Sequence, residues 1–228
     1  MNKIVILTGA GISAESGLGT FRDEGGLCAE HRIEDVATPE GFAKNPKLVH
    51  EFYNKRRNQA ADVMPNAAHA ALARLQKNYP GDVVIVTQNV DDLHERAGAS
   101  VLHMHGALTG ALCAACDHRW MAPPEMAPDD VCPNCLTQAT RPDIVWFGEM
   151  PYEMDTIAGH MSNVGLFVSI GTSGNVYPAA GFVQDARMIG AKTLELNLEP
   201  SEGASFFDEA RTGRASEIVP AWVEEVLV

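Results

Sequence analysis

The chain has 228 residues, 46% of them hydrophobic and 21% charged, and no apolar run approaches the ~20 residues that cross a bilayer. It does not open on the basic and apolar segments of a signal peptide, so we expect a cytoplasmic protein that does not bind membranes. The net charge of −13 disfavours nucleic acid and favours basic partners such as lysine-rich peptides, although solubility alone would explain it equally well.

The first predicted element is a buried strand over residues 4–8, followed at once by Gly9-x-Gly11-x-x-Ala14. The glycines permit a sharp turn and the close approach of a phosphate, and the small Ala14 would let the next helix pack on the strand. Residues 16–26 are glycine-rich and polar, which predicts a long loop over the phosphate site. A dehydrogenase would have a packed helix, a strand and then an acidic residue here, so that class is disfavoured.

Residues 29–65 predict a small helical module inserted into the first crossover. Thr38 is a candidate cap for a helix that begins at Pro39. A second helix is indicated by apolar residues at helical spacing: Leu48, Val49, Phe52 and Tyr53. Another helix begins at Pro65 or Asn66.

Further apolar runs predict strands that alternate with helical segments, at residues 82–87, 101–106, 144–149, 165–170 and 192–196. This alternation is typical of an α/β fold with a doubly wound parallel sheet, in which ligands bind beyond the carboxyl ends of the strands. We expect one domain over residues 1–228. Its Rossmann-like part would cover 1–28, 66–108 and 143–228, with a helical insert at 29–65 and a zinc module at 109–142.

The zinc module is predicted from two Cys-x-x-Cys pairs, and 15 residues lie between the pairs. This spacing matches a structural zinc template, in which two tight turns close a tetrahedron of thiolates: Cys113, Cys116, Cys132 and Cys135. Disulfides are the alternative, which a cytoplasmic location disfavours. Iron in place of zinc is less favoured, and so is a site in which His118 replaces one of the four cysteines as a ligand. The fifth cysteine, Cys28, is expected to be a small buried side chain.

Several motifs, taken together, resemble the sirtuins, which are NAD-dependent protein lysine deacylases. They span nearly the whole chain in the family's order: Gly9–Gly17 with Phe21-Arg22, Gln88–His94, His105-Gly106, the two cysteine pairs, Phe147–Glu149, Gly171–Ser173 and Asn197–Glu199. The chain looks most like the bacterial, desuccinylase-type branch of that family.

The resemblance implies a role for each matched position. His105 would be the catalytic base, acting with Asn89 and Asp91. The NAD site would be lined by Gly9, Ala10, Gly11, Ser13, Glu15, Phe21, Arg22, Gln88, Asn89, Asp91, Gly171, Thr172, Ser173, Asn197, Leu198, Glu199 and Ala215. One side of the peptide groove would be formed by Val145, Phe147, Gly148 and Glu149.

The resemblance also implies the reaction. The amide oxygen of an acyl-lysine attacks the ribose carbon that bears nicotinamide, nicotinamide leaves, and NAD is consumed as a co-substrate. A ribose hydroxyl is then deprotonated, which suits a histidine of near-neutral pKa, and hydrolysis gives lysine and O-acyl-ADP-ribose. Spacing alone does not choose between His105 and His103, which fall on the same side of the predicted strand, and does not exclude His94. Gly106 matches the family pattern and favours His105.

Tyr53 and Arg56 share one face of the predicted helix. From the sequence alone this pair reads as a solvated helix face. The resemblance implies instead that the phenol and the guanidinium bind the distal carboxylate of a succinyl or malonyl group, and that the small Ala37 widens the acyl pocket. We therefore expect desuccinylase, demalonylase and deacetylase activity.

Two other interpretations of the same residues remain. An ADP-ribosyltransferase or NAD hydrolase would use the same pocket and send the ribose to another acceptor. An NAD-sensing binding module with a zinc site would bind the dinucleotide without catalysis. We expect acyl-lysine proteins as partners and a monomeric protein.

Overall fold

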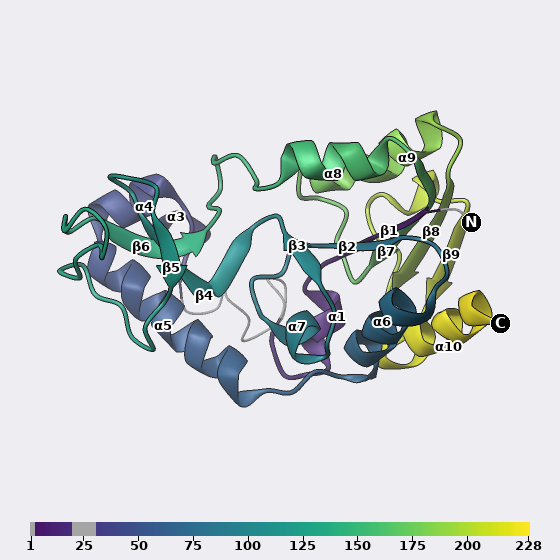
Figure 1. Ribbon diagram of the computed structural model, residues 1–228, viewed down its shortest axis with the longest axis horizontal. Helices are drawn as coiled ribbons and strands as arrows, with labels where there is room; N and C mark the ends of the chain where they lie inside the picture. The colour runs from purple at the N-terminus through teal and green to yellow at the C-terminus, as the bar shows by residue number, and fades with distance from the viewer. Residues whose placement is uncertain (1–2, 20–30) are drawn as a thin grey trace.

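The computed structural model describes residues 3–19 and 31–228, so Phe21, Arg22 and Cys28 lie outside the described residues. Its larger lobe is built on a six-stranded sheet with the order β3-β2-β1-β7-β8-β9, and every neighbouring pair is parallel (Figure 1). The strands are β1 (Lys3–Thr8), β2 (Val83–Thr87), β3 (Val101–His103), β7 (Val164–Ile170), β8 (Lys192–Asn197) and β9 (Glu209–Thr212). The predicted doubly wound α/β fold is confirmed.

Helices cover both faces of this sheet because β1 is apolar on both sides. Ile4 and Ile6 pack toward α6 (Ala67–Asn78) and α10 (Ala215–Leu227), whereas Val5 and Leu7 pack toward α8 (Met154–Met161) and α9 (Phe182–Met188). Figure 1 shows these two pairs of helices on opposite sides of the sheet. Within residues 3–19 and 31–228, none of the helices combines the length and apolar character that a membrane crossing requires.

The smaller lobe joins three helices to a three-stranded antiparallel sheet with the order β5-β4-β6, at the opposite end of the molecule from both chain termini (Figure 1). Its elements are α3 (Ile33–Val36), α4 (Pro39–Lys44), α5 (Pro46–Asp62), β4 (Gly106–Cys113), β5 (Arg119–Met121) and β6 (Thr140–Ile144). The predicted cap is present, because the hydroxyl of Thr38 accepts a hydrogen bond from the backbone N–H of Gly41. The division into modules at 29–65 and 109–142 stays a prediction.

Three sequence predictions are wrong in detail. The strand expected over residues 101–106 ends at His103, because the chain turns at Gly106, where φ is +77° and an added Cβ would lie 2.0 Å from the carbonyl oxygen of Asp143. The run 144–149 is a turn after β6, closed by a hydrogen bond from the N–H of Glu149 to the carbonyl of Trp146. Ala14 is exposed, because α1 (Gly11–Ala14) is too short to pack as a crossover helix.

The loops after β1 and β7 touch backbone to backbone. Gly9 donates its N–H to the carbonyl of Ile170 at 3.0 Å, and Gly11 donates to the carbonyl of Gly171 at 2.9 Å. At Gly171 φ is +62°, and an added Cβ would lie 2.5 Å from the backbone nitrogen of Ile12. Only glycine therefore fits where these two loops meet.

Gly171→Ala is expected to lower the free energy of unfolding by at least about 2 kcal/mol, because it adds left-handed strain to a backbone clash. Thermal or denaturant unfolding measures the loss. Gly159→Ala is the matched control: it lies in α8 with no atom near its Cβ position, and it should be neutral or stabilise by about 0.5–1 kcal/mol. Equal stability of the two variants would contradict the close approach.

Candidate functional site

The site lies at the carboxyl edge of the six-stranded sheet. Because all its strands are parallel, the segments that follow β1, β2, β3, β7 and β8 leave from the same edge. The strand order reverses between β1 and β7, and such a switch point is where open α/β sheets bind ligands. The close contact of Gly9 and Gly11 with Gly171 lies at this point, so the switch point itself is formed by glycine backbone.

On the β8 side of the switch point, Asn197 ties three loops together. Its side-chain amide donates to the carbonyl of Thr172 at 2.7 Å, and its backbone carbonyl accepts from the N–H of Gly213 at 3.0 Å. Nearby, the carboxylate of Glu15 accepts hydrogen bonds from the backbone N–H and hydroxyl of Ser216, both at 2.9 Å. This brings the first loop against the start of α10 and places it beside Ala215.

On the β2 side, a buried polar cluster forms around Ser13. Its hydroxyl donates to the Oδ2 of Asp91 at 3.1 Å and accepts from the side-chain amide of Asn89 at 3.1 Å. Burial raises the pKa of Asp91, while hydrogen bonds from the backbone N–H of Leu93 and from Ser13 oppose that rise. The cluster therefore holds a carboxylate and an amide in fixed orientations at the strand ends.

Two buried histidines lie behind this cluster. His94 shares a 3.0 Å hydrogen bond with the hydroxyl of Thr8, which in turn donates to Thr87 at 2.9 Å. His69 lies 3.4 Å from the hydroxyl of Ser13, and the two imidazole rings meet edge to face at 4.9 Å. Burial lowers the pKa of His69 to about 4 and that of His94 to about 3, so both rings are neutral at physiological pH.

The three histidines that spacing left open have different partners. His103 contacts two acceptors, the carbonyl of Asn89 at 3.0 Å and the carboxylate of Glu95 at 2.6 Å, so both of its nitrogens serve as donors. Burial alone would lower the pKa of His103, but the hydrogen bond and charge of Glu95 raise it overall. Such an imidazolium has no lone pair to accept a proton.

His105 lies beyond the strand that ends at His103, and among the described residues only one of its ring nitrogens has a hydrogen-bond partner. Its Nδ1 lies 3.1 Å from the carbonyl of Gln88, which assigns the proton to Nδ1 and leaves a lone pair on Nε2. Burial lowers the pKa of His105, and the Gln88 carbonyl partly opposes the shift. A neutral imidazole with one free nitrogen is the form that a general base requires.

The segment that follows β6 lies between His105 and the helical part of the small lobe. Val145 donates its N–H to the carbonyl of His105, and Phe147 donates its N–H to the carbonyl of Ala37, both at 3.0 Å. A salt bridge holds the segment in place: Arg141 donates to the two carboxylate oxygens of Glu149 at 2.7 and 2.9 Å. Burial would raise the pKa of Glu149, but Arg141 lowers it overall.

Tyr53 is buried, contrary to the solvated helix face that its sequence context indicates. The indole Nε1–H of Trp146 donates to its hydroxyl oxygen at 3.1 Å, and burial raises the pKa of Tyr53 to about 12. Burial lowers the pKa of Arg56, while the neighbouring Tyr53 and Asp91 oppose that shift. Among the described residues the guanidinium has a Phe52 ring at 5.9 Å but no hydrogen-bonding or ionic partner.

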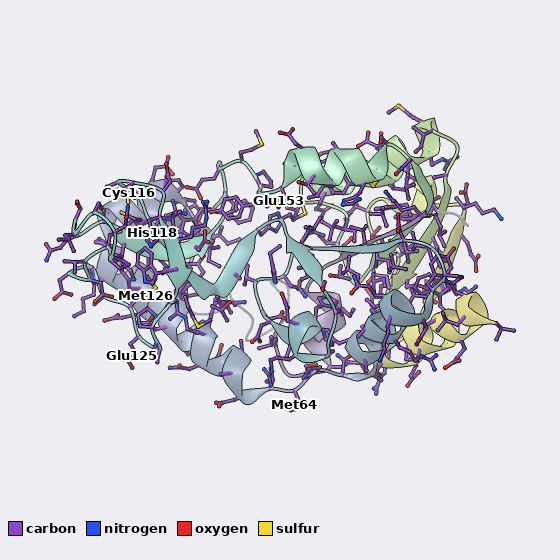
Figure 2. The ribbon with its side chains drawn as sticks, in the orientation of Figure 1. Met64, Cys116, His118, Glu125, Met126 and Glu153 are labelled. Atoms are coloured by element: carbon purple, nitrogen blue, oxygen red, sulfur yellow. The ribbon has the colours of Figure 1, made fainter. Side chains whose placement is uncertain are left out.

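The four cysteines of the small lobe converge, with their sulfur atoms within 4.8 Å of one another. The Cys113–Cys135 and Cys116–Cys132 sulfur pairs are 3.6 and 3.8 Å apart, close to the ~3.8 Å edge of a tetrahedron with 2.3 Å zinc–sulfur bonds. The cysteines are free thiols, which is inconsistent with the disulfide alternative, and the cluster is consistent with structural zinc. Figure 2 places Cys116 and His118 in the small lobe, remote from the sheet edge.

Several residues at the site escaped the sequence prediction. Thr8 and Thr87 look like strand ends in the sequence, Arg141 looks like an exposed cation, and Trp146 looks like an ordinary core residue. His69 is the third helical residue after Asn66 and completes a capping box with it, but the sequence signature of such a box has Glu or Gln at this position. The remaining predicted positions lie on the loops at the sheet edge, and Leu198 and Glu199 are exposed there.

Comparison with known proteins finds similar chains in one family. The family model of the Sir2 family matches residues 9–178. An NAD-dependent protein deacylase of Caulobacter vibrioides is 54% identical, with 99% of this chain and 97% of the relative covered. The NAD-dependent protein deacylase SIR2rp3 of Trypanosoma brucei brucei is 55% identical, with coverages of 98% and 94%.

Solved structures of Sir2 proteins also resemble this chain. A crystal structure of a Sir2 homologue in complex with NAD superposes with a TM-score of 0.90 at 35% identity, covering 98% of this chain and 89% of the other. A structure of Sir2 bound to an acetylated peptide gives a TM-score of 0.81 at 26% identity, with coverages of 97% and 92%.

The buried histidines predict a loss of stability in mild acid. Below pH 6.5 the unfolded chain protonates His69 and His94, whereas the folded chain does not until about pH 4 and 3. The unfolded state then binds more protons, so the free energy of unfolding should fall by about 1.4 kcal/mol per pH unit for each residue. The opposite contribution of His103, whose pKa is raised, acts only above pH 6.5.

Denaturant unfolding between pH 6.5 and 5 measures this slope. The variant His94→Gln should show a slope smaller by about 1.4 kcal/mol per pH unit, because one histidine no longer titrates. A free energy of unfolding that stays constant over this window would contradict neutral burial of the two rings.

Proposed function

The chain belongs to the Sir2 family, and we propose that it is an NAD-dependent protein lysine deacylase that removes succinyl, malonyl and acetyl groups. The sequence-based assignment to the sirtuins is confirmed by the family match and by relatives that are 54–55% identical over the full chain. The observation that carries the reaction is the geometry of His105, whose Nε2 has no hydrogen-bond partner within residues 3–19 and 31–228, at the point where the sheet edge meets the segment that follows β6.

In this reaction NAD supplies the ribose carbon that receives the acyl oxygen as nicotinamide departs. His105 accepts a hydroxyl proton from the ribose at Nε2, while its Nδ1–H stays anchored on the Gln88 carbonyl. Asn89 and Asp91 hold the nicotinamide end through donors and acceptors that the Ser13 hydroxyl orients. The loops that Asn197 joins would hold the adenosine half.

The acyl-lysine peptide would lie along residues 145–149, as an added strand between this segment and a facing loop. The hydrogen bond from Val145 to His105 ties the peptide side directly to the proposed base. The salt bridge between Arg141 and Glu149 keeps this segment in place while the substrate exchanges.

Preference for acidic acyl groups is supported by Tyr53 and Arg56. The Tyr53 oxygen already accepts the indole N–H of Trp146, so the phenol's own proton is available for a ligand. The raised pKa of Tyr53 keeps that proton in place, and Arg56 adds a cation. A carboxylate at the end of the acyl chain would therefore meet one neutral and one charged donor.

The deciding experiment is incubation with NAD and succinyl-, malonyl- and acetyl-lysine peptides, read by mass spectrometry. Free lysine peptide and O-acyl-ADP-ribose are expected. His105→Asn should lower the rate by at least about 100-fold, because it removes the general base. His160→Asn, a histidine of α8 outside the site, should leave the rate unchanged. ADP-ribosylated peptide, or free ADP-ribose with intact acyl-lysine, would instead indicate a transferase or an NAD hydrolase.

Arg56→Met is expected to lower kcat/KM for the succinyl peptide by about 100-fold and to leave that for the acetyl peptide within about threefold, because only the acidic acyl group loses a charged partner. Lys47→Met is the control, since it removes an exposed cation from the same helix. Trp146→Phe keeps an aromatic ring over Arg141 but removes the indole donor, and it should raise KM for the succinyl peptide alone. Desuccinylation that survives Arg56→Met would disprove the carboxylate receptor.

A further inference from the structure

The segment that follows β6 is closed at its base by a contact between its two ends. The phenol of Tyr152, just before α8, donates to Oδ1 of Asp143, near the end of β6, at 2.8 Å. The two residues are nine positions apart in the chain, and residues 145–149 lie between them. Figure 1 shows this part of the chain crossing from the small lobe to the large lobe. The contact therefore makes the crossing segment a closed loop.

Both ends of this loop also contact the residues around His105. The backbone N–H of Tyr152 donates to the carbonyl of Met104 at 2.9 Å, and the N–H of Val145 donates to the carbonyl of His105 at 3.0 Å. These backbone hydrogen bonds fix each end of the loop relative to the proposed base. The phenol of Tyr152 fixes the two ends relative to each other.

A cation from the edge of the small sheet joins the same carboxylate. Arg119 of β5 donates its Nε–H to Oδ1 of Asp143 at 3.3 Å and lies 3.2 Å from Oδ2. Its guanidinium also lies over the ring of Tyr152, 4.8 Å from the centroid. The side chain of Asp143 is 15% exposed, whereas that of Arg119 is 50% exposed. The shielded carboxylate is therefore paired with one neutral and one charged donor.

Two features keep the contact in this form. On the neighbouring strand β4, Gly110 leaves room for the carboxylate, because an added Cβ there would lie 2.9 Å from the Cβ of Asp143. Burial raises the pKa of Tyr152, the hydrogen bond to Asp143 adds to the rise, and Arg119 opposes it. The phenol therefore keeps its proton at neutral pH and remains a donor.

We propose that Asp143, Tyr152 and Arg119 form a clasp of positioning residues, which holds residues 144–151 in the shape that receives an acyl-lysine peptide. The inference rests on the proposed function, which places the peptide along residues 145–149. A peptide that binds as an added strand needs the backbone groups of this segment already in line. The clasp restricts the backbone before the peptide arrives, so less conformational freedom is lost on binding.

The clasp acts at a different place from the salt bridge between Arg141 and Glu149. That salt bridge fixes the middle of the segment, where the Glu149 carboxylate also accepts the N–H of Trp146 at 2.8 Å. The clasp fixes the two ends of the segment and links them to β5. The described residues assigned to NAD lie on other loops, so the clasp should affect the peptide and not the dinucleotide.

The first test does not depend on activity. Tyr152→Phe keeps the ring beside Arg119 and removes only the hydroxyl. In the full-length chain, hydrogen exchange read by mass spectrometry should become at least about fivefold faster over residues 144–152 and stay unchanged over α6. Ser162→Ala is the matched control, because it removes a 2.9 Å hydroxyl hydrogen bond at the end of α8, and it should leave exchange over residues 144–152 unchanged.

The second test separates the two substrates. With peptide varied at saturating NAD, Tyr152→Phe should raise KM about fivefold for succinyl and acetyl peptides alike, because the clasp acts on the peptide backbone and not on the acyl group. At saturating peptide, kcat/KM for NAD should stay within about twofold of wild type. Arg119→Met should raise KM for the peptide about twofold, since its contact is half exposed.

The double variant Tyr152→Phe/Arg119→Met tests whether both residues act through Asp143. Its KM for the peptide should rise by less than the product of the two single effects. Single effects that multiply in full would contradict the clasp.

Three other outcomes would overturn the proposal: unchanged exchange over residues 144–152 in Tyr152→Phe, an unchanged KM for the peptide, or an equal fall in kcat/KM for both substrates. If wild type deacylates none of the peptides, the proposed function fails. The exchange comparison then decides by itself whether the clasp holds the segment.

Discussion

The hydrogen bond from Gly11 to the carbonyl of Gly171 is the contact on which the site depends. It requires two loops, from strands more than 150 residues apart in sequence, to meet with no side chain between them. Because the glycines at that meeting point have no side chains, they supply no acidic, basic or amide side chain to a ligand. The chemistry has to come from the neighbouring strand ends, on β2 and β8.

This division explains why the polar side chains fall into two groups. The β2 side holds Asn89, Asp91 and His105, the groups to which the proposed reaction assigns nicotinamide release and proton transfer. The β8 side holds Asn197, which joins the loops that would surround an adenosine. Each group is held by hydrogen bonds within the chain, so little reorganisation is needed when a ligand arrives.

The sheet strands were predictable because their β-branched runs lie between glycines and polar turns, as in residues 4–8. β9 was not, because Glu209–Thr212 is an exposed edge strand with no apolar pattern. The proposed base could not be chosen from spacing. His103 and His105 differ in their partners, Glu95 and the Gln88 carbonyl, and no periodicity in the sequence indicates these contacts. The contact of Trp146 with Tyr53 spans 93 residues and is visible only in the fold.

The acyl pocket as proposed selects its substrate through the cost of an unpaired charge. Arg56 is partly buried, its pKa is lowered by burial, and no carboxylate pairs with it among the described residues. An acetyl group would supply no carboxylate to Arg56, whereas a succinyl group would supply one. Discrimination then arises less from extra attraction to one substrate than from a polar group that only that substrate satisfies. Tyr53, held by Trp146 as a donor, makes the pocket complementary to an acceptor in the same way.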